Sequence, residues 1–190
     1  FVPLRDAQAR HVRLEFTPAK AGGAVGIQTL AAMEPEFSDT PNGFFKQVAA
    51  VYPRGRFPRP FSGEQSYWTV LGLPSDRSEA AINEEGAVEV AKGQWTIEPF
   101  LFTDGRLLTW ADGTHTQRLA NQYIPIPSVE RKHDRVRLEV TAFVEGASNA
   151  GVLHVCYEIS PTGAAPVSGE LRLAVRPFQV LPPWQELNIE

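Results

Sequence analysis

Short stretches in which apolar and polar residues alternate recur along this chain. Residues 4–16 contain Val12, Leu14 and Phe16 at every second position, which predicts a half-buried strand. Residues 25–33 follow two glycines and predict a second strand. We therefore expect residues 1–36 to contain a pair of strands.

The spacing of apolar residues becomes helical between residues 44 and 52. Apolar side chains there share one helical face, and Pro53 ends the predicted helix. Residues 54–60 then alternate arginines with prolines and a glycine, which is typical of an extended surface connector. We place a domain boundary near this connector and assign residues 37–65 to the helix and connector.

From residue 66 onward, short predicted strands are separated by turn residues at intervals typical of an antiparallel sandwich or barrel. Asp104-Gly105 predicts a tight hairpin, because both residues tolerate a positive φ. The expected strands cover residues 67–71, 86–90, 95–102, 107–110, 124–130, 136–144, 152–159 and 169–175. The sequence thus predicts a mainly β fold: an antiparallel β-sandwich over residues 66–180, one short helix, and a linker over residues 181–190.

Charge and hydropathy exclude several classes of partner. The chain has 190 residues, a net charge of −4 and no basic stripe interleaved with aromatics, which argues against nucleic acid and anionic membranes as partners. No apolar run approaches the ~18 residues of a membrane span, and no signal peptide pattern opens the chain. We expect a soluble segment and leave its compartment open. Phe1 stands where a whole protein has its initiator Met, so we expect both ends to be cut from a longer polypeptide.

The single cysteine, Cys156, lies in the apolar run 152–157 and is expected to be a small buried hydrophobic residue. One unpaired cysteine leaves the redox compartment open.

Residue types that carry out catalysis are present, but their spacing predicts no catalytic centre. Glu84 and Glu85 are adjacent, so on a strand they would point to opposite faces, and we expect a solvated turn. No nucleophilic serine motif and no phosphate-binding loop is found. The histidines show no metal-ligand spacing: His11, His115, His133 and His154. We assign no catalytic residue, no metal and no cofactor.

Aromatic residues are the best candidates for ligand binding, because sugar rings stack on flat aromatic faces. Core packing is the more common role of Trp68 and Trp95 in a sandwich. Trp110 lies near a predicted loop and is the least secure as a core residue. The candidate carbohydrate-binding residues are Trp110, Trp68 and Tyr123.

The tract 176–184 contains three prolines and cannot continue as a central strand. Its apolar side chains should nevertheless be covered, by the sandwich or by a following domain. Phe178 and Trp184 are the candidates for docking to that domain.

Four motifs resemble a family of large bacterial proteins: 61–72 (FSGEQSYWTVLG), 82–86 (INEEG), 109–112 (TWAD) and 176–185 (RPFQVLPPWQ). In this family a discoidin-type (coagulation-factor type C) domain precedes a galactose-mutarotase-like supersandwich and an (α/α)6 barrel of the six-hairpin glycosidase class. The resemblance covers about residues 37 to 190, and residues 1–36 are similar to the last strands of the discoidin module. It implies that the catalytic carboxylates lie in the barrel, so no catalytic residue is transferred to this chain.

Three functions are therefore compared. The first is a non-catalytic accessory sandwich of a glycoside-hydrolase-like enzyme, whose partner is the downstream catalytic domain of the same chain. The second is a carbohydrate-binding module, which should expose at least two coplanar aromatic rings, and the third is an independent enzyme. An accessory domain should instead expose a broad apolar patch.

Overall fold

The computed structural model describes residues 10–15, 31, 41–74, 78–147, 150–177 and 180, and for residues 41 and 42 only the backbone. The chain divides into two compact units, residues 1–48 and 49–190. Among the described residues, no helix is both long and apolar enough to cross a membrane.

In the first unit, residues 10–15 do not form the expected strand. Val12 is 61% exposed and Leu14 is 41% exposed, and none of the described residues pairs with this stretch. An alternating pattern becomes a half-buried strand only where a neighbouring strand pairs with its edge and another layer covers one of its faces. Except for Ala31, the second expected strand lies outside the described residues.

The predicted helix is confirmed as α1 (Pro41–Ala50). Pro41 suits the first position of a helix, where its missing N–H is not needed. The helix begins three residues earlier than its apolar pattern indicated. Tyr52 lies beyond its end, in a turn closed by a hydrogen bond from the Tyr52 N–H to the Ala49 carbonyl at 3.1 Å.

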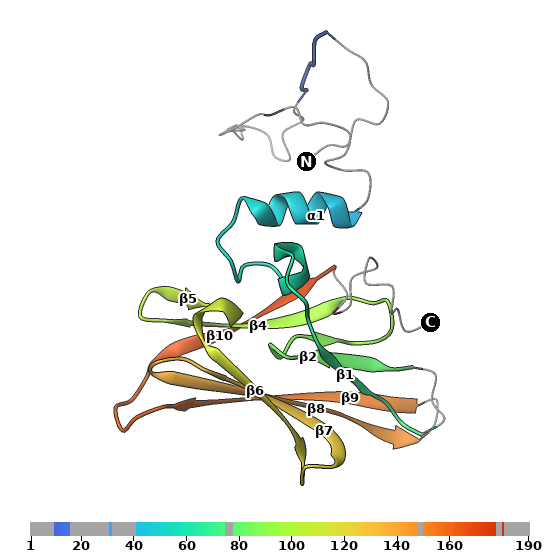
Figure 1. Cartoon of the computed structure of the whole chain (residues 1–190), viewed down its shortest axis with the longest axis vertical. Helices are drawn as coiled ribbons and strands as arrows, with labels where there is room; N and C mark the ends of the chain where they lie inside the picture. Colours follow the sequence, from blue (N-terminus) through green and yellow to red (C-terminus); the bar gives the residue numbers. More distant parts are fainter. Residues whose placement is uncertain are drawn as a thin grey trace, which may run out of the picture. The chain divides into compact units, whose positions relative to one another are not determined.

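The second unit is the predicted antiparallel β-sandwich, built from two sheets (Figure 1). The six-stranded sheet has the order β1 (Trp68–Leu71), β2 (Ala80–Asn83), β3 (Val88–Glu89), β4 (Thr96–Thr103) and β10 (Gly169–Arg176), with β5 (Arg106–Leu108) also paired to β4. The four-stranded sheet has the order β6 (Thr114–Ala120), β7 (Ile124–Lys132), β8 (Val136–Ala147) and β9 (Ala150–Pro161). Two 3-10 turns complete it, η2 (Arg59–Ser62) and η3 (Trp110–Asp112).

The core lies between the two sheets, on what we call their core faces. Alternate residues of β8 point into it, and Leu138 and Ala142 are fully buried there. Ile82, Val88 and Leu101 meet them from the six-stranded sheet. Burying a side chain of this kind contributes roughly 1.5–3 kcal/mol, so this layer is the main source of stability.

The hairpin between β4 and β5 is confirmed, because Asp104 and Gly105 both have a positive φ, 52° and 72°. Two other strands were missed for opposite reasons. All four residues of β2 are buried, so its sequence does not alternate. All side chains of β6 are exposed or half-buried, so its sequence lacks an apolar pattern.

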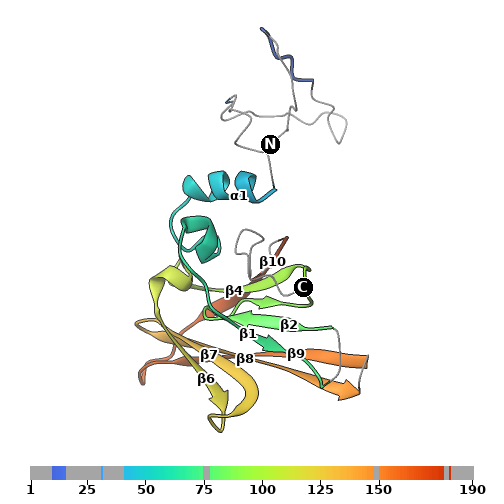
Figure 2. The same cartoon turned by 45° about the vertical axis from the view of Figure 1, so that its right-hand side comes forward.

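β9 and β10 are the edge strands on one side of the sandwich, within the part of the chain that the structure describes (Figure 2). Apolar side chains on their core faces stay exposed: Ile159 at 45%, Leu173 at 48% and Val175 at 67%. Together with Val167 and Leu171, these residues form what we call the β9–β10 seam. Cys156 lies on the other face of β9 opposite Thr141 and is exposed. Its expected burial was wrong, because the alternation of β9 turns it away from the core.

Candidate functional site

Residues 53–65 cover the outer face of the six-stranded sheet, the face turned away from the four-stranded sheet (Figure 1). We call this segment the cover. Gly55 is buried with φ +94°, and a Cβ there would lie 2.1 Å from the Thr109 hydroxyl. The Trp110 indole N–H donates to the Phe57 carbonyl at 2.9 Å. The cover is thus a packed element, which corrects the expected extended surface connector.

Arg59 joins the cover to the sheet. Its guanidinium pairs with Glu85 and lies 3.1 Å from Glu64 and 3.5 Å from Glu84. Glu85 is only 4% exposed, which corrects the expected solvated turn. The Asn83 side chain fixes this turn by accepting the N–H groups of Glu85, at 3.1 Å, and Ala87, at 2.8 Å.

A second buried carboxyl, Glu98, lies on the outer face of β4. It accepts a hydrogen bond from the Arg176 Nε at 2.9 Å, and Arg176 also donates to the Arg56 carbonyl of the cover at 2.7 Å. Burial raises the pKa of Glu85 and of Glu98 to about 7, against the opposing effect of Arg59 on Glu85 and of Arg176 on Glu98. Two carboxyls with perturbed pKa values are typical of active sites and of structural ion-pair networks alike.

Arg131 brings a positive charge into the interior from β7. It is 2% exposed and donates to the Pro99 carbonyl at 2.8 Å. Burial lowers the pKa of Arg131 to about 10, opposed by Glu98, Glu85 and Asp112. Burial and Arg131 also lower the pKa of His115 to about 4 and shift the pKa of His133 downward, so both imidazoles are neutral near pH 7. Among the described residues, no group of three or more His, Cys, Asp or Glu could hold a metal ion.

The chain that leaves β10 is anchored by a third buried carboxylate. Glu89 accepts the Val180 N–H at 2.9 Å and the Gly93 N–H at 2.7 Å, and Val180 is 4% exposed. Burial raises the pKa of Glu89, although these hydrogen bonds oppose the effect. The tract after β10 therefore docks on the sandwich at Val180.

The structure does not gather the predicted carbohydrate-binding residues on one element. Trp110 is 2% exposed, and the guanidinium carbons of Arg54 and Arg59 lie 4.5 and 4.8 Å from its ring centroid. Trp68 is half-buried and opens β1 of one sheet, whereas Tyr123 is 77% exposed in a turn of the other. Phe178 and Trp184 lie outside the described residues. Trp95, which we expected in the core, is 43% exposed.

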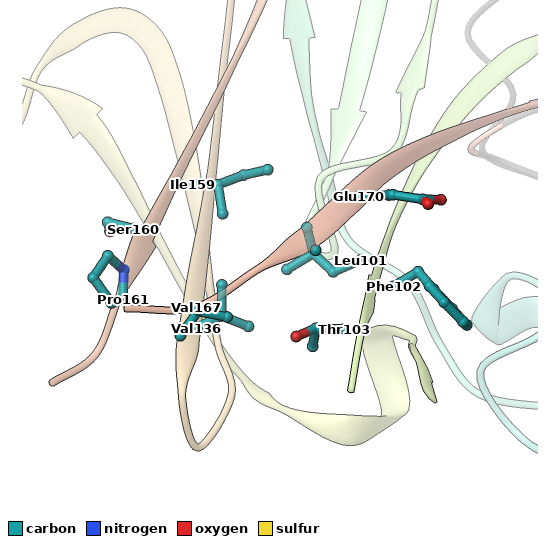
Figure 3. A pocket seen from close by; sticks show the side chains of 10 residues that line it. Leu101, Phe102, Thr103, Val136, Ile159, Ser160, Pro161, Val167 and Glu170 are labelled. Atoms are coloured by element: carbon teal, nitrogen blue, oxygen red, sulfur yellow. The ribbon is translucent and has the colours of Figure 1, made fainter. Parts of the chain in front are cut away.

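A pocket that is partly open to solvent lies between the sheets where β9 leads into β10 (Figure 3). Ile159, Val136 and Val167 line one side, and Leu101 lies across from them. Thr103 donates its hydroxyl to the Ser168 carbonyl at 2.8 Å beside it. The lining is mainly apolar, with Thr103, Ser160 and Glu170 as its polar members, so the pocket suits a mainly apolar group.

Sequence reasoning missed the residues that hold this region together: Arg59, Glu89, Glu98 and Arg131. A signal for Glu98 was present, because it interrupts the otherwise apolar run 97–102. A charged side chain in a buried strand needs an oppositely charged or hydrogen-bonding partner, because its desolvation is otherwise too costly. Arg131 had the same signal, since it follows Val129 at the strand period.

Comparison of the chain with protein-family models, with curated proteins and with solved structures found no match.

Proposed function

We propose that this chain is a non-catalytic accessory β-sandwich of a glycoside-hydrolase-like, carbohydrate-active enzyme. Its task is to hold a following catalytic barrel in a fixed direction. The resemblance of the motifs at residues 61–72 and 176–185 supplies the enzyme class. The physical part of the proposal is that the sandwich acts as a rigid support.

The observation that carries the proposal is the anchored exit from β10. Arg176 is held by Glu98 and by the Arg56 carbonyl, and Val180 is held by Glu89. A flexible tether would leave the direction of a following domain free, whereas two buried anchor points fix it. The buried carboxyls Glu85 and Glu98 also fit this role, because arginines and the cover occupy the space in which a substrate would have to lie.

The test compares the 190-residue chain with the longer polypeptide in which the proposal places it. We expect the chain alone to hydrolyse no aryl glucoside or galactoside, and the longer protein to hydrolyse at least one. Turnover by the chain alone that disappears in Glu85→Gln or Glu98→Gln would contradict the proposal and favour an independent enzyme.

A second measurement addresses the supporting role. In the longer protein, Glu89→Ala should increase the motion between the sandwich and the following domain, measured by small-angle scattering or by fluorescence transfer between labels. Glu158→Ala, at an exposed position of β9, is the matched control and should leave that motion unchanged. Equal motion in both variants would remove the supporting role from the proposal.

A further inference from the structure

β10 has an outer edge, on the side away from β4. Apolar side chains lie on one face of this strand, and a pair of charged side chains lies on the other. No described strand pairs with this edge. Leu171, Leu173 and Val175 share the core face, and the two larger exposures among them are 48% and 67%. A free edge with exposed apolar side chains favours pairing with another strand.

The opposite face of β10 carries charges in a self-complementary order. Glu170 and Arg172 pair with each other at 2.9 Å, and their side chains are 63% and 50% exposed. In an antiparallel pairing of two identical strands centred on Leu171, Glu170 of each chain lies directly opposite the partner's Arg172. Each guanidinium then lies between two carboxylates, and opposite charges at facing positions stabilise a strand pair.

The same register matches the apolar face. Leu171 faces the partner's Leu171, and Gly169 faces the partner's Leu173. Gly169 lines the pocket of Figure 3. Because it has no side chain, it does not block the approach of the partner's Leu173 to that pocket. The exposed leucine of each chain therefore meets an apolar opening on the other.

We propose that the β9–β10 seam is an interface with a second copy of this chain, in which β10 pairs antiparallel with the partner's β10 about Leu171. The six-stranded sheets of the two copies then form one continuous sheet, and the exposed seams become a shared core. This interface uses the free edge of β10 about Leu171 and needs neither the Val180 anchor nor a following domain, so it goes beyond the proposed function and does not depend on it.

The experiment uses paired charge reversals. Sedimentation velocity of the 190-residue chain should show a concentration-dependent dimer. Glu170→Lys places a lysine opposite the partner's Arg172, and Arg172→Glu places two glutamates opposite each other. Each variant alone should therefore dimerise at least about tenfold more weakly. An equimolar mixture of the two variants should recover the dimer, because every facing pair is then oppositely charged.

Lys132→Glu is the matched control, since it reverses an exposed charge on β7, away from the seam, and should leave dimerisation unchanged. Circular dichroism should show the same fold in all variants. As a second measurement, Leu171→Cys in a Cys156→Ser background should form an intermolecular disulfide, because directly facing Cα atoms lie within reach of one. Thr116→Cys in the same background should not.

Three results would overturn the proposal. One is a monomeric wild-type chain at every concentration. Another is a mixture of Glu170→Lys and Arg172→Glu that dimerises as weakly as each variant alone, which would exclude this register. The third is a longer polypeptide that is monomeric while the β10 amides that point away from β4 are protected from hydrogen exchange, which would show that another strand of the same protein covers the seam.

Discussion

At the residue scale, the carboxyl groups of Glu85 and Glu98 make the stability of the sandwich fall as pH rises, whereas the lowered pKa values of His115 and His133 have the opposite effect below about pH 6.5. Burial raises both pKa values from 4.5 to about 7, so the folded state binds these protons more tightly than the unfolded state does. The resulting stabilisation is complete below the ordinary pKa and is lost as pH rises through about 7.

Above the ordinary pKa of histidine, about 6.5, only the carboxyls still titrate, so we expect the free energy of unfolding to fall between about pH 6.5 and pH 8, by about 1 kcal/mol for each group. Glu98→Gln should reduce this slope, because an amide does not titrate. Urea unfolding at several pH values measures it, with Glu158→Gln, at an exposed position, as the control. A wild-type chain that gains stability over this range would contradict the prediction.

Gly55 is a second residue whose role is local. Its φ is +94°, and a Cβ would lie 2.1 Å from the Thr109 hydroxyl oxygen. Gly63 also has a positive φ, +74°, but a Cβ there would meet nothing within 4 Å. The two glycines thus separate the cost of backbone strain from the cost of a clash.

Gly63→Ala should destabilise the chain by about 1 kcal/mol, because only the backbone is strained. Gly55→Ala should cost about 3 kcal/mol or more, since the cover must also move away from Thr109. Thermal or urea unfolding of both variants tests this difference. Equal losses would mean that the cover is not tightly docked at Gly55.

At the scale of elements, Arg54 and Arg59 allow a matched comparison of two ion pairs in the cover. Both guanidinium groups lie over the Trp110 ring. Arg59 pairs with the buried Glu85, whereas Arg54 pairs at the surface with Glu64 at 2.6 Å. Removing one partner of a buried pair leaves an uncompensated charge, which costs far more than the loss of a surface pair.

Arg59→Gln should therefore destabilise the chain by about 2 to 4 kcal/mol, and Arg54→Gln by less than about 1 kcal/mol. Arg59→Gln should also raise the rate of proteolysis within the cover. Urea unfolding and limited proteolysis measure the two effects. Similar losses in both variants would show that stacking on Trp110, rather than the pair with Glu85, holds the cover.

The elements that could be predicted are those whose sequence signal is contained in a few neighbouring residues. Val136, Leu138 and Val140 alternate within one strand, and Asp104-Gly105 defines its own turn, so β8 and the β4–β5 hairpin were found. β6 was missed because its side chains are all exposed or half-buried, and its place in the sheet depends on a neighbouring strand that the local sequence does not identify. The packing of the cover was missed for the same reason.

At the scale of the whole molecule, the candidate site depends on residues far apart in the chain. Arg59 and Glu85 are separated by 26 residues, and Arg176 and Glu98 by 78. No local pattern connects such pairs, so Glu85 was interpreted as a surface residue. The mainly β class and the antiparallel arrangement could be predicted, because turn spacing repeats along the chain regardless of which strands are neighbours.

The pairing of β4 with β10 also determines when the sandwich can form. Contacts between these segments span 65 and 78 residues, whereas β8 and β9 are adjacent in the sequence and pair from Ala147 and Ala150 onward. Closing a long loop costs more conformational entropy and slows folding. During refolding, amides of the β8–β9 hairpin should become protected from pulsed deuterium labelling before those of β10. Until β10 arrives, one edge of β4 stays unpaired, so the last strand to pair governs how long the folding chain is prone to aggregation.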